Sequence, residues 1–419
     1  MKNIINFIKR NKWWIALHLV SILILVQCYL YVVEILKLGC NVISFKYTLV
    51  FYLSIAILLS YIYYFIIRVN RKKAILAILI TVLMLLSTEI ILRFVVKSKL
   101  TYSEKRGERV YQSPYQQRTY LKNNEKPLRP DLLFRYEPNS IRIESCNEFT
   151  YEHEYNNEGI RDDDITKLRG NNEVRILCLG DSYTEGVGAP QDSTWVQLLE
   201  NQFTRDNPDK NINCINAGIA GADPIYSYYL MQTLMGYQPD LVLLSINNTE
   251  VSEIIRRGGF NRIKNGKPNL KLGPKWEPFF AISFVFRHIA MDVFNYTFEL
   301  KTKKRMEKEA VEAYDLLDES IHKMADLAQQ SNAAFALIIQ PTEPEIVYKE
   351  TKLDAFVEHI AMTTDYNILY ILPCMTRKMI ESGEHLDQYF WQVDQHLNGR
   401  GYKILSECVY ERLNMQTQQ

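Results

Sequence analysis

The sequence predicts an α/β domain with a parallel sheet of about five strands, preceded by three transmembrane helices. Two features of the 419 residues lead to this fold class. Three apolar runs of about 20 residues, each long enough to cross a bilayer as a helix, fill most of the first hundred positions. After them, short β-branched runs alternate with helical patterns, which is typical of a parallel sheet covered by helices on both faces.

The three apolar runs span residues 13–33, 47–67 and 74–96. The first has no small-residue cleavage site, so we do not expect it to be removed as a signal peptide. Lysine and arginine gather before the first run and between the second and third, and the positive-inside rule then predicts a cytoplasmic N-terminus. We therefore expect a multi-pass membrane protein in which residues 1–96 form the anchor and the rest lies on the extracytoplasmic side.

Residues 97–148 are polar, rich in tyrosine and interrupted by proline, and we expect a linker with a short pre-domain segment. A strand at 149–155 then opens the main domain, residues 149–419. The strands of the parallel sheet are predicted at 174–179, 212–216, 241–246, 334–339 and 368–372, and helices at 194–203, 224–235, 303–330 and 401–413.

A short motif with chemical meaning, Gly180-Asp181-Ser182, directly follows the first strand of this sheet. A serine there lies at the carboxyl end of a parallel strand, where open α/β sheets bind their ligands. The glycine permits a tight turn at that point. By itself the tripeptide is also an ordinary helix N-cap sequence, so further residues must support a nucleophile.

Those further residues follow later strands of the sheet. A serine nucleophile needs a base, a group that orients the base, and donors for the oxyanion. The segment 216–221 at the end of the second strand contains glycines that can present a backbone N–H, and Asn247-Asn248 after the third strand carry amide donors. Asp394 and His396 stand just before the last helix. The sequence thus contains every part of such a site.

In these blocks the chain resembles the SGNH (GDSL-like) hydrolase superfamily, and more closely its bacterial membrane-tethered members, over roughly 149–413. The resemblance implies a three-layer α/β/α domain and a serine esterase or acyl-transfer enzyme. It implies Ser182 as nucleophile, His396 as base and Asp394 as the residue that fixes the tautomer of His396. It also implies that Gly221 and Asn247 hold the oxyanion together with the N–H of Ser182.

Two departures from the family's pattern leave alternatives open. In the segment after the third strand, Ser245-Ile246-Asn247-Asn248, serine replaces the family's usual glycine and Asn248 its usual aspartate. Asn248 is therefore a rival of Asn247 as oxyanion donor. The family's commoner D-x-x-H spacing is shortened to D-x-H. Asp394 then reaches the imidazole either as the i and i+2 neighbour in an extended segment or through a loop.

Other candidate groups are favoured less. His385 is the one competitor of His396 as base. The acidic cluster 162–164 could bind a cation and Arg256-Arg257 an anionic sugar, but a solvated helix start and a polar turn are the favoured interpretations. We expect no metal and no cofactor. The seven cysteines include no C-x-x-C pair, which argues against a zinc site and a disulfide framework, and one disulfide stays open without named partners.

These observations predict an esterase that removes O-acyl groups from an envelope carbohydrate through an acyl-serine. A short acyl group is favoured because no long apolar lid is evident. The alternatives are an O-acyltransferase of envelope polysaccharide with the same triad, and an inactive glycan-binding or scaffold protein. The net charge of +1 indicates no nucleic-acid partner, and no protein partner can be named. We expect residues 260–296, rich in aromatic and basic side chains, to shape the substrate site.

Overall fold

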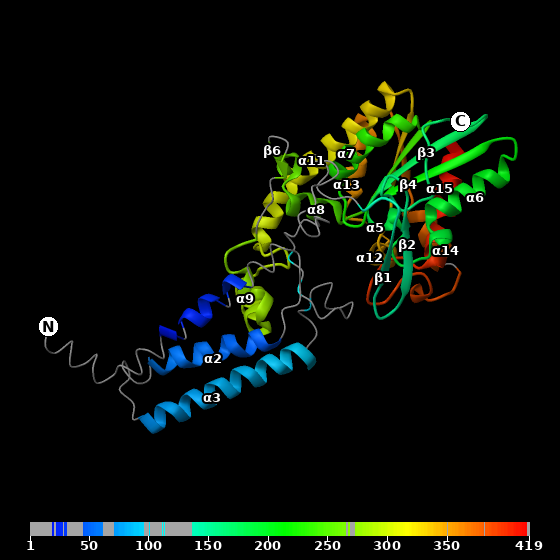
Figure 1. Ribbon diagram of the computed structural model, residues 1–419. Helices are drawn as coiled ribbons and strands as arrows, with labels where there is room; N and C mark the ends of the chain where they lie inside the picture. The colour runs from blue at the N-terminus through cyan, green and yellow to red at the C-terminus, as the bar shows by residue number, and fades with distance from the viewer. Residues whose placement is uncertain are drawn as a thin grey trace. The chain divides into compact units, whose positions relative to one another are not determined.

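The computed structural model describes residues 19–20, 22–27, 29–31, 45–61, 71–95, 100, 111, 113, 136–264, 267–268, 273–349, 351–380 and 382–416. The chain divides into two compact units (Figure 1). One unit contains residues 1–116 and 272–305, and the other contains residues 117–271 and 306–419. The sheet and all the candidate site residues belong to the second unit.

The centre of the second unit is a five-stranded parallel sheet with the order β4-β3-β5-β8-β9. Its strands are β3 (Glu173–Gly180), β4 (Asn211–Gly218), β5 (Leu241–Ile246), β8 (Ala334–Ile339) and β9 (Asn367–Tyr370). The prediction of a parallel sheet of five strands is therefore confirmed. Because β4 lies on one side of β3 and β5 on the other, the connections diverge around β3, and such a switch point is where open α/β sheets form their ligand crevice.

Helices cover both faces of this sheet (Figure 1). On one face pack α7 (Pro224–Leu234), α11 (Lys303–Gln330) and α13 (Asp354–Thr363), and on the other α6 (Trp195–Asp206), α14 (Leu372–Ile380) and α15 (Gly399–Gln416). Leu177 and Leu179 of β3 point into the first layer, whereas Ile176 and Cys178 point into the second. Burial on both faces explains why the strands read as nearly continuous apolar runs.

Local capping sets where several of these helices begin. The Thr194 hydroxyl accepts from the N–H of Gln197 at the start of α6, and Asp223 accepts from Tyr226 at the start of α7, where Pro224 fills the first helical position. The shorter elements of this unit are α5 (Ser182–Glu185), α8 (Glu250–Arg257), α12 (Glu343–Tyr348), η4 (Gln191–Ser193), η5 (Met235–Tyr237), η6 (Gly259–Arg262), η8 (Leu386–Gln388), β6 (Ile263–Lys264) and β7 (Lys267–Pro268).

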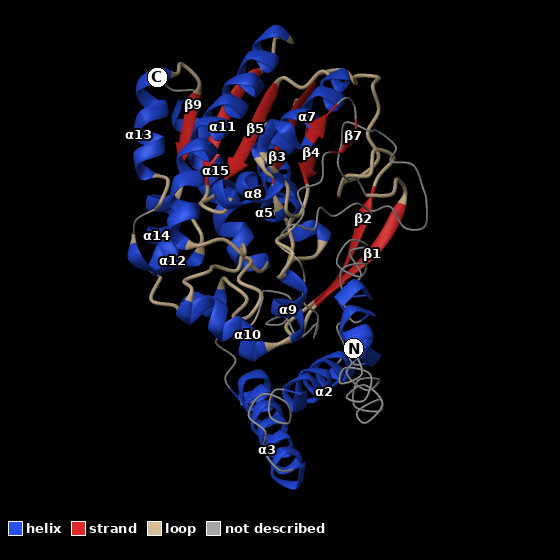
Figure 2. Cartoon of the chain, turned by 90° about the vertical axis from the view of Figure 1, so that its left-hand side faces the viewer, coloured by secondary structure: helices blue, strands red, loops and turns tan. Residues whose placement is uncertain are grey.

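An antiparallel hairpin precedes the sheet in the same unit (Figure 2). Its strands are β1 (Ser140–Ser145) and β2 (Thr150–Tyr155), of which β2 matches the strand predicted at 149–155. Residues of β2 alternate between exposed and inward positions, so that His153 and Tyr155 are buried. The hairpin therefore presents one of its faces to the rest of the unit.

One disulfide joins two helices of the same layer. Cys374 of α14 and Cys408 of α15 are bonded with a Cα–Cα distance of 5.8 Å, closing a separation of 34 residues. Cys178 and Cys214 are free and buried within the sheet, and Cys146 is free and half-buried. The structure thus supplies the pairing for which the cysteine spacing gives no partners.

The other unit contains the helices from the apolar N-terminal region. Helix α2 (Phe45–Tyr61) has 17 residues, and α3 (Arg71–Ile90) has 20 and continues into the short π-helix η2 (Ile91–Val95). Helix α3 opens with three basic residues and carries Glu89 near its end. Within the described part of the chain, no helix has both the length and the apolar character needed to cross a membrane.

This finding contradicts the expectation of three transmembrane helices. It counts equally against the predicted multi-pass location in a bacterial inner or cytoplasmic membrane with an extracytoplasmic catalytic domain. The apolar run at 47–67 is described only as far as Tyr61, as part of the 17-residue helix α2, and the helix of the run at 74–96 includes charged residues at both ends. Of the run at 13–33, residues 13–18, 21, 28, 32 and 33 lie outside the described residues.

A later segment of the chain packs with these helices in the same unit. It forms α9 (Glu277–Ile282), α10 (Phe284–His288) and the π-helix η7 (Ile289–Val293). The buried Glu89 carboxylate of α3 accepts from the backbone N–H groups of Phe284 and Val285 at the start of α10 and from the Tyr52 hydroxyl of α2. Most of the described part of the stretch 260–296, expected to shape the substrate site, thus belongs to this unit.

Candidate active site

Ser182 begins the short helix α5 immediately after β3. Asp181 is its N-cap, with one carboxylate oxygen accepting from the N–H of Tyr183 at 2.9 Å. A Cβ on Gly180 would lie 2.2 Å from the Thr184 hydroxyl, so only glycine fits at this position. The sharp turn from strand to helix therefore places Ser182 at the carboxyl end of the central strand, as the motif predicts.

His396 and Asp394 lie in line with this serine. The Nε2 atom of His396 is 2.7 Å from the Ser182 hydroxyl oxygen, and its Nδ1 is 2.5 Å from a carboxylate oxygen of Asp394. Asp394 is fully buried, and its backbone N–H donates to Glu148 in the turn of the β1–β2 hairpin. The three side chains thus form one continuous chain of hydrogen bonds.

The short D-x-H spacing works through a turn. Gln395 has φ of 68°, a left-handed conformation, so Asp394 and His396 are not alternate residues of an extended strand. The N–H of Trp391 donates to the carbonyl of His396, and the N–H of Gln395 donates to the carbonyl of Trp391. Of the two routes left open by the sequence, the loop is therefore the one used.

Two backbone N–H groups are available beside the serine. Gly221, in the turn after β4, has φ of 73°, and the N–H of Ala222 closes this turn on the carbonyl of Ile219 at 2.8 Å. Among the described residues, neither the N–H of Ser182 nor that of Gly221 donates to a backbone or side-chain acceptor. Unpaired N–H groups of this kind are what a developing oxyanion requires.

The two rival asparagines point to different partners. The buried Asn247 donates from Nδ2 to Asp181 at 2.9 Å, and its oxygen accepts from the N–H and hydroxyl of Thr249. The amide is thereby oriented beside the serine turn and retains a second N–H. Asn248 instead donates to the Thr342 hydroxyl, in the loop after β8. Asn247 is therefore the amide linked to the nucleophile's own N-cap.

Buried carboxyl groups surround this turn. Burial raises the pKa of Asp181, although hydrogen bonds from Tyr183 and Asn247 and the charge of His396 oppose that rise. Burial also raises the pKa of Glu250 well above its usual range, and the charges of Asp181 and Asp223 raise it further. Burial thus favours the neutral form of the Glu250 carboxyl group.

Several residues that hold the site in place carry no signal in the sequence. The buried Arg161 guanidinium donates to the carbonyls of Glu185, Gly186 and Ala189, which follow the serine. A Cβ on Gly218 would lie 2.1 Å from the backbone nitrogen of Glu185, so β4 passes α5 at a distance that only glycine allows. A single arginine or glycine has no periodicity or motif that would mark it in advance.

The other candidate groups lie in different surroundings. His385 is 90% exposed and faces Asp387, while His153 is buried against Glu185. Asp162 accepts from the N–H of Asn216, and burial raises its pKa to about 7. Among the described residues no group of three or more histidine, cysteine, aspartate or glutamate side chains could hold a metal ion.

The predicted arginine pair is held in ion pairs on α8. Arg256 and Arg257 both contact Glu253. A Cβ on Gly221 would lie 3.1 Å from Arg257, so this guanidinium lies against the turn that presents the Gly221 N–H.

Comparison with known proteins gives structural neighbours only. No family model matches the sequence, and no curated protein matches it. Similar solved structures include a two-domain esterase active on acetylated mannans, with 11% identity and a TM-score of 0.38. That likeness covers 59% of this chain and 51% of the esterase, so this chain spans about half of that protein's length.

For two further solved structures the likeness covers most of the other chain. An α/β hydrolase, LAE5, from the metagenome of Lake Arreo has 15% identity and a TM-score of 0.37, covering 57% of this chain and 95% of its own. A GDSL-like lipase from Bacteroides thetaiotaomicron has 15% identity and a TM-score of 0.31, covering 58% and 88%.

Proposed function

We propose that this protein is a serine esterase that forms an acyl-serine intermediate on Ser182. The observation that carries the proposal is the unbroken chain of hydrogen bonds from the Ser182 hydroxyl through His396 to Asp394. A serine becomes nucleophilic when a neighbouring base removes its proton. This geometry also argues against an inactive glycan-binding or scaffold protein, which would have no need to maintain it.

The mechanism follows from the positions of these groups. Nε2 of His396 accepts the Ser182 proton as the oxygen attacks the ester carbonyl, and Asp394 keeps Nδ1 protonated and stabilises the imidazolium. The oxyanion is held by the N–H groups of Ser182 and Gly221 and by the second amide N–H of Asn247. His396 then gives its proton to the leaving alcohol. Water attacks the acyl-serine with His396 again as base, and the free acid leaves.

For the substrate we propose an O-acylated carbohydrate. Supporting it is an aromatic cluster of Phe149, Tyr151 and Trp391 that packs against Val187 and Ala220, residues of the loops that carry Ser182 and Gly221. Tyr151 and Trp391 remain partly exposed. Sugar rings have apolar C–H faces that pack on aromatic rings. The envelope location expected from the apolar N-terminal region forms no part of this proposal.

The test uses the full chain and its Ser182→Ala variant with a small chromogenic acetyl ester and with acetylated polysaccharide. We expect the wild type to release acetate from both and to react with a fluorophosphonate at Ser182, and the variant to do neither while keeping its circular dichroism spectrum. Acetylation of added sugars in place of release of free acetate would indicate an acyltransferase. Hydrolysis that persists in Ser182→Ala would exclude this serine as the nucleophile.

A further inference from the structure

We propose that Glu185 is a positioning residue of the candidate oxyanion site: its carboxylate holds the turn that presents the Gly221 N–H in place relative to Ser182. This proposal rests on the proposed function, because the direction of that N–H matters for catalysis only if an oxyanion forms beside it. Glu185 touches no reacting atom, and it acts through the backbone of the turn after β4.

The contacts of Glu185 join three parts of the unit. Ser182 is the first residue of α5 and Glu185 is its last, so the two are one helical turn apart. The carboxylate accepts hydrogen bonds from the hydroxyls of Tyr136 (2.9 Å) and Tyr155 (3.0 Å), from Nδ1 of His153 (3.1 Å) and from the backbone N–H of Ala220. It therefore links the helix of the nucleophile to the turn that contains Gly221 and to the β1–β2 hairpin, where it contacts Tyr155, and to Tyr136 just before that hairpin.

The bond to Ala220 matters because of the kind of turn in which it lies. Ala220 and Gly221 are the central residues of the turn closed between Ile219 and Ala222, and φ of 73° at Gly221 is typical of the third position of a type II turn. Type I and type II turns differ by rotation of the central peptide, which here carries the Gly221 N–H. The hydrogen bond on the N–H of Ala220 fixes the first peptide of this turn, and so the position of the Cα from which the central peptide starts.

The charge of Glu185 strengthens this anchor. The side chain is only 1% exposed, and burial by itself raises its pKa. The hydrogen bond and charge of His153, the N–H of Ala220 and the charge of Arg161 outweigh burial and lower the pKa to about 2. The group is therefore an anion throughout the neutral range, and hydrogen bonds to an anion are about twice as strong as those between neutral groups.

A neutral amide cannot satisfy the same partners. Glutamine at position 185 has one acceptor oxygen and an NH2 group, whereas the donors around it include the N–H of Ala220 and the hydroxyl groups of two tyrosines. We expect Glu185→Gln to loosen the turn and to lower kcat about 10- to 100-fold, because the loss of one oxyanion donor costs about 10²–10³ in kcat and here the donor is displaced. The KM for a small acetyl ester should change less than about twofold, since ground-state binding does not depend on this N–H.

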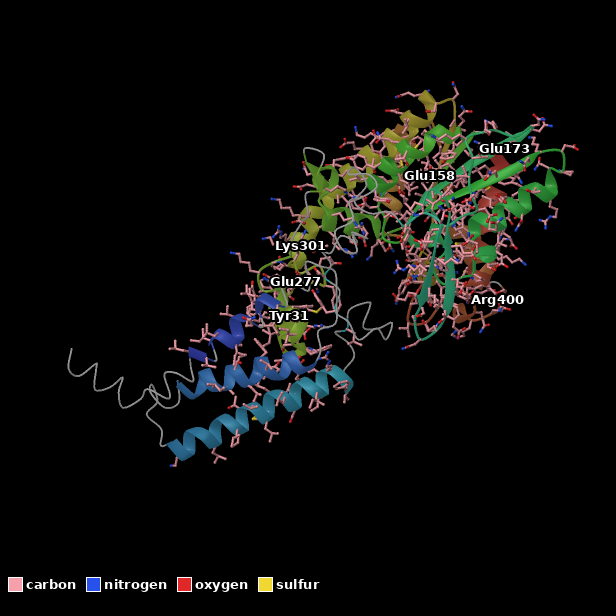
Figure 3. All side chains as sticks on the ribbon, viewed as in Figure 1. Tyr31, Glu158, Glu173, Glu277, Lys301 and Arg400 are labelled. Carbon is pink, nitrogen blue, oxygen red and sulfur yellow. A yellow bond between two sulfur atoms is a disulfide. The ribbon has the colours of Figure 1, made fainter. Side chains whose placement is uncertain are left out.

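The matched control is Glu173→Gln. Glu173, labelled in Figure 3, is a buried carboxylate at the opposite end of β3 that bonds to Arg175 and to the N–H of Gly170. The kcat of each variant is divided by the number of sites labelled at completion by a fluorophosphonate, so that unfolded protein does not count. Glu173→Gln should keep the wild-type kcat per site even where its Tm falls.

Two tyrosine variants complete the experiment. Tyr155→Phe removes one donor and should lower kcat per site by about 2- to 5-fold, with no additional loss in the background of Glu185→Gln, since Tyr155 acts through Glu185. If Glu185→Gln does not fold, Tyr155→Phe and Tyr136→Phe decide the question in its place. Wild-type kcat per site in Glu185→Gln, or in both tyrosine variants, would overturn the proposal. So would equal losses in Glu185→Gln and Glu173→Gln. Activity retained in Ser182→Ala would instead overturn the proposed function.

Discussion

At the scale of single residues, Ser182 and His396 are separated by 214 positions in the chain and by 2.7 Å in space. The imidazole has one nitrogen toward the serine and the other toward the buried Asp394, so its tautomer is determined by the carboxylate. Left-handed Gln395 turns the chain between the two residues, so that their contact forms through a loop and not along a strand.

We therefore expect Asp394→Asn to lower kcat for a small acetyl ester by about 10³- to 10⁴-fold with little change in KM. An amide can donate to Nδ1 and hold the imidazole in the wrong tautomer for accepting the serine proton. Steady-state kinetics with the same ester measure the effect. Asp387→Asn and His385→Ala are the controls, because both residues lie outside this hydrogen-bond chain and His385 is 90% exposed. A loss of similar size in His385→Ala would assign the role of base to His385.

Residues also differ in how well the sequence reveals them. Ser182 is predictable because glycine, aspartate and serine stand together after an apolar run, and every part of that signal is local. Arg161 and His153 give no such signal, because a lone basic residue looks the same whether it is buried or exposed. Asn247 and Asn248 are adjacent and chemically identical, and only their partners, Asp181 and Thr342, separate them.

At the scale of elements, local pattern accounts for most of the second unit. The strands predicted at 241–246 and 334–339 and the helix predicted at 303–330 have the bounds that the structure gives to β5, β8 and α11. Such runs are long enough for their period to be unambiguous. The contact between α14 and α15 could not be predicted in this way, because the disulfide that joins them depends on how both helices pack on the sheet.

We expect reduction of Cys374–Cys408 to lower the free energy of unfolding by about 4 kcal/mol. The bond closes a loop of 34 residues, and in the chain-entropy account a loop of that length restricts the unfolded state by about this amount. Urea unfolding with and without reductant measures the difference. Reductant should have no effect on a variant with both cysteines changed to serine, and Cys146→Ser, at a free cysteine, should keep the full effect. Equal stability of the oxidised and reduced wild type would contradict this prediction.

At the scale of the whole molecule, the second unit buries several carboxyl groups around its site, and their pKa values move in both directions. Burial raises the pKa of Glu250 and Asp181, whereas donors lower that of Glu185 to about 2 despite its burial. A carboxyl whose pKa is lower in the folded state contributes stability above its unfolded pKa, about 4.5 for glutamate, and loses it as pH falls toward the folded value. Protonation of Glu185 in acid should therefore destabilise the folded unit.

We expect the difference in unfolding free energy between the wild type and Glu185→Gln to shrink by about 2 kcal/mol as the pH falls from 6 to 3. The reason is that the wild-type glutamate binds a proton more readily when unfolded in this range, and the glutamine does not titrate. Urea unfolding at several pH values gives both curves. For Glu173→Gln, whose carboxylate is also held at a lowered pKa by Arg175 despite partial burial, the difference should shrink as well. A constant difference for Glu185→Gln would show that its pKa is the same in both states.

The sequence by itself determined the parallel sheet and the serine turn at the end of its first strand, because both depend on residues that are neighbours in the chain. It was wrong about the apolar N-terminal region: hydrophobicity predicted three membrane spans, but no described helix can cross a membrane. Only the tertiary structure decided that Asn247 faces the serine turn, that Asp394 reaches His396 through a left-handed residue, and that Glu185 joins the hairpin to the turn of Gly221. Each of these contacts joins residues that the order of the strands brings together, and a hydrogen bond between distant positions leaves no pattern in the sequence on either side of it.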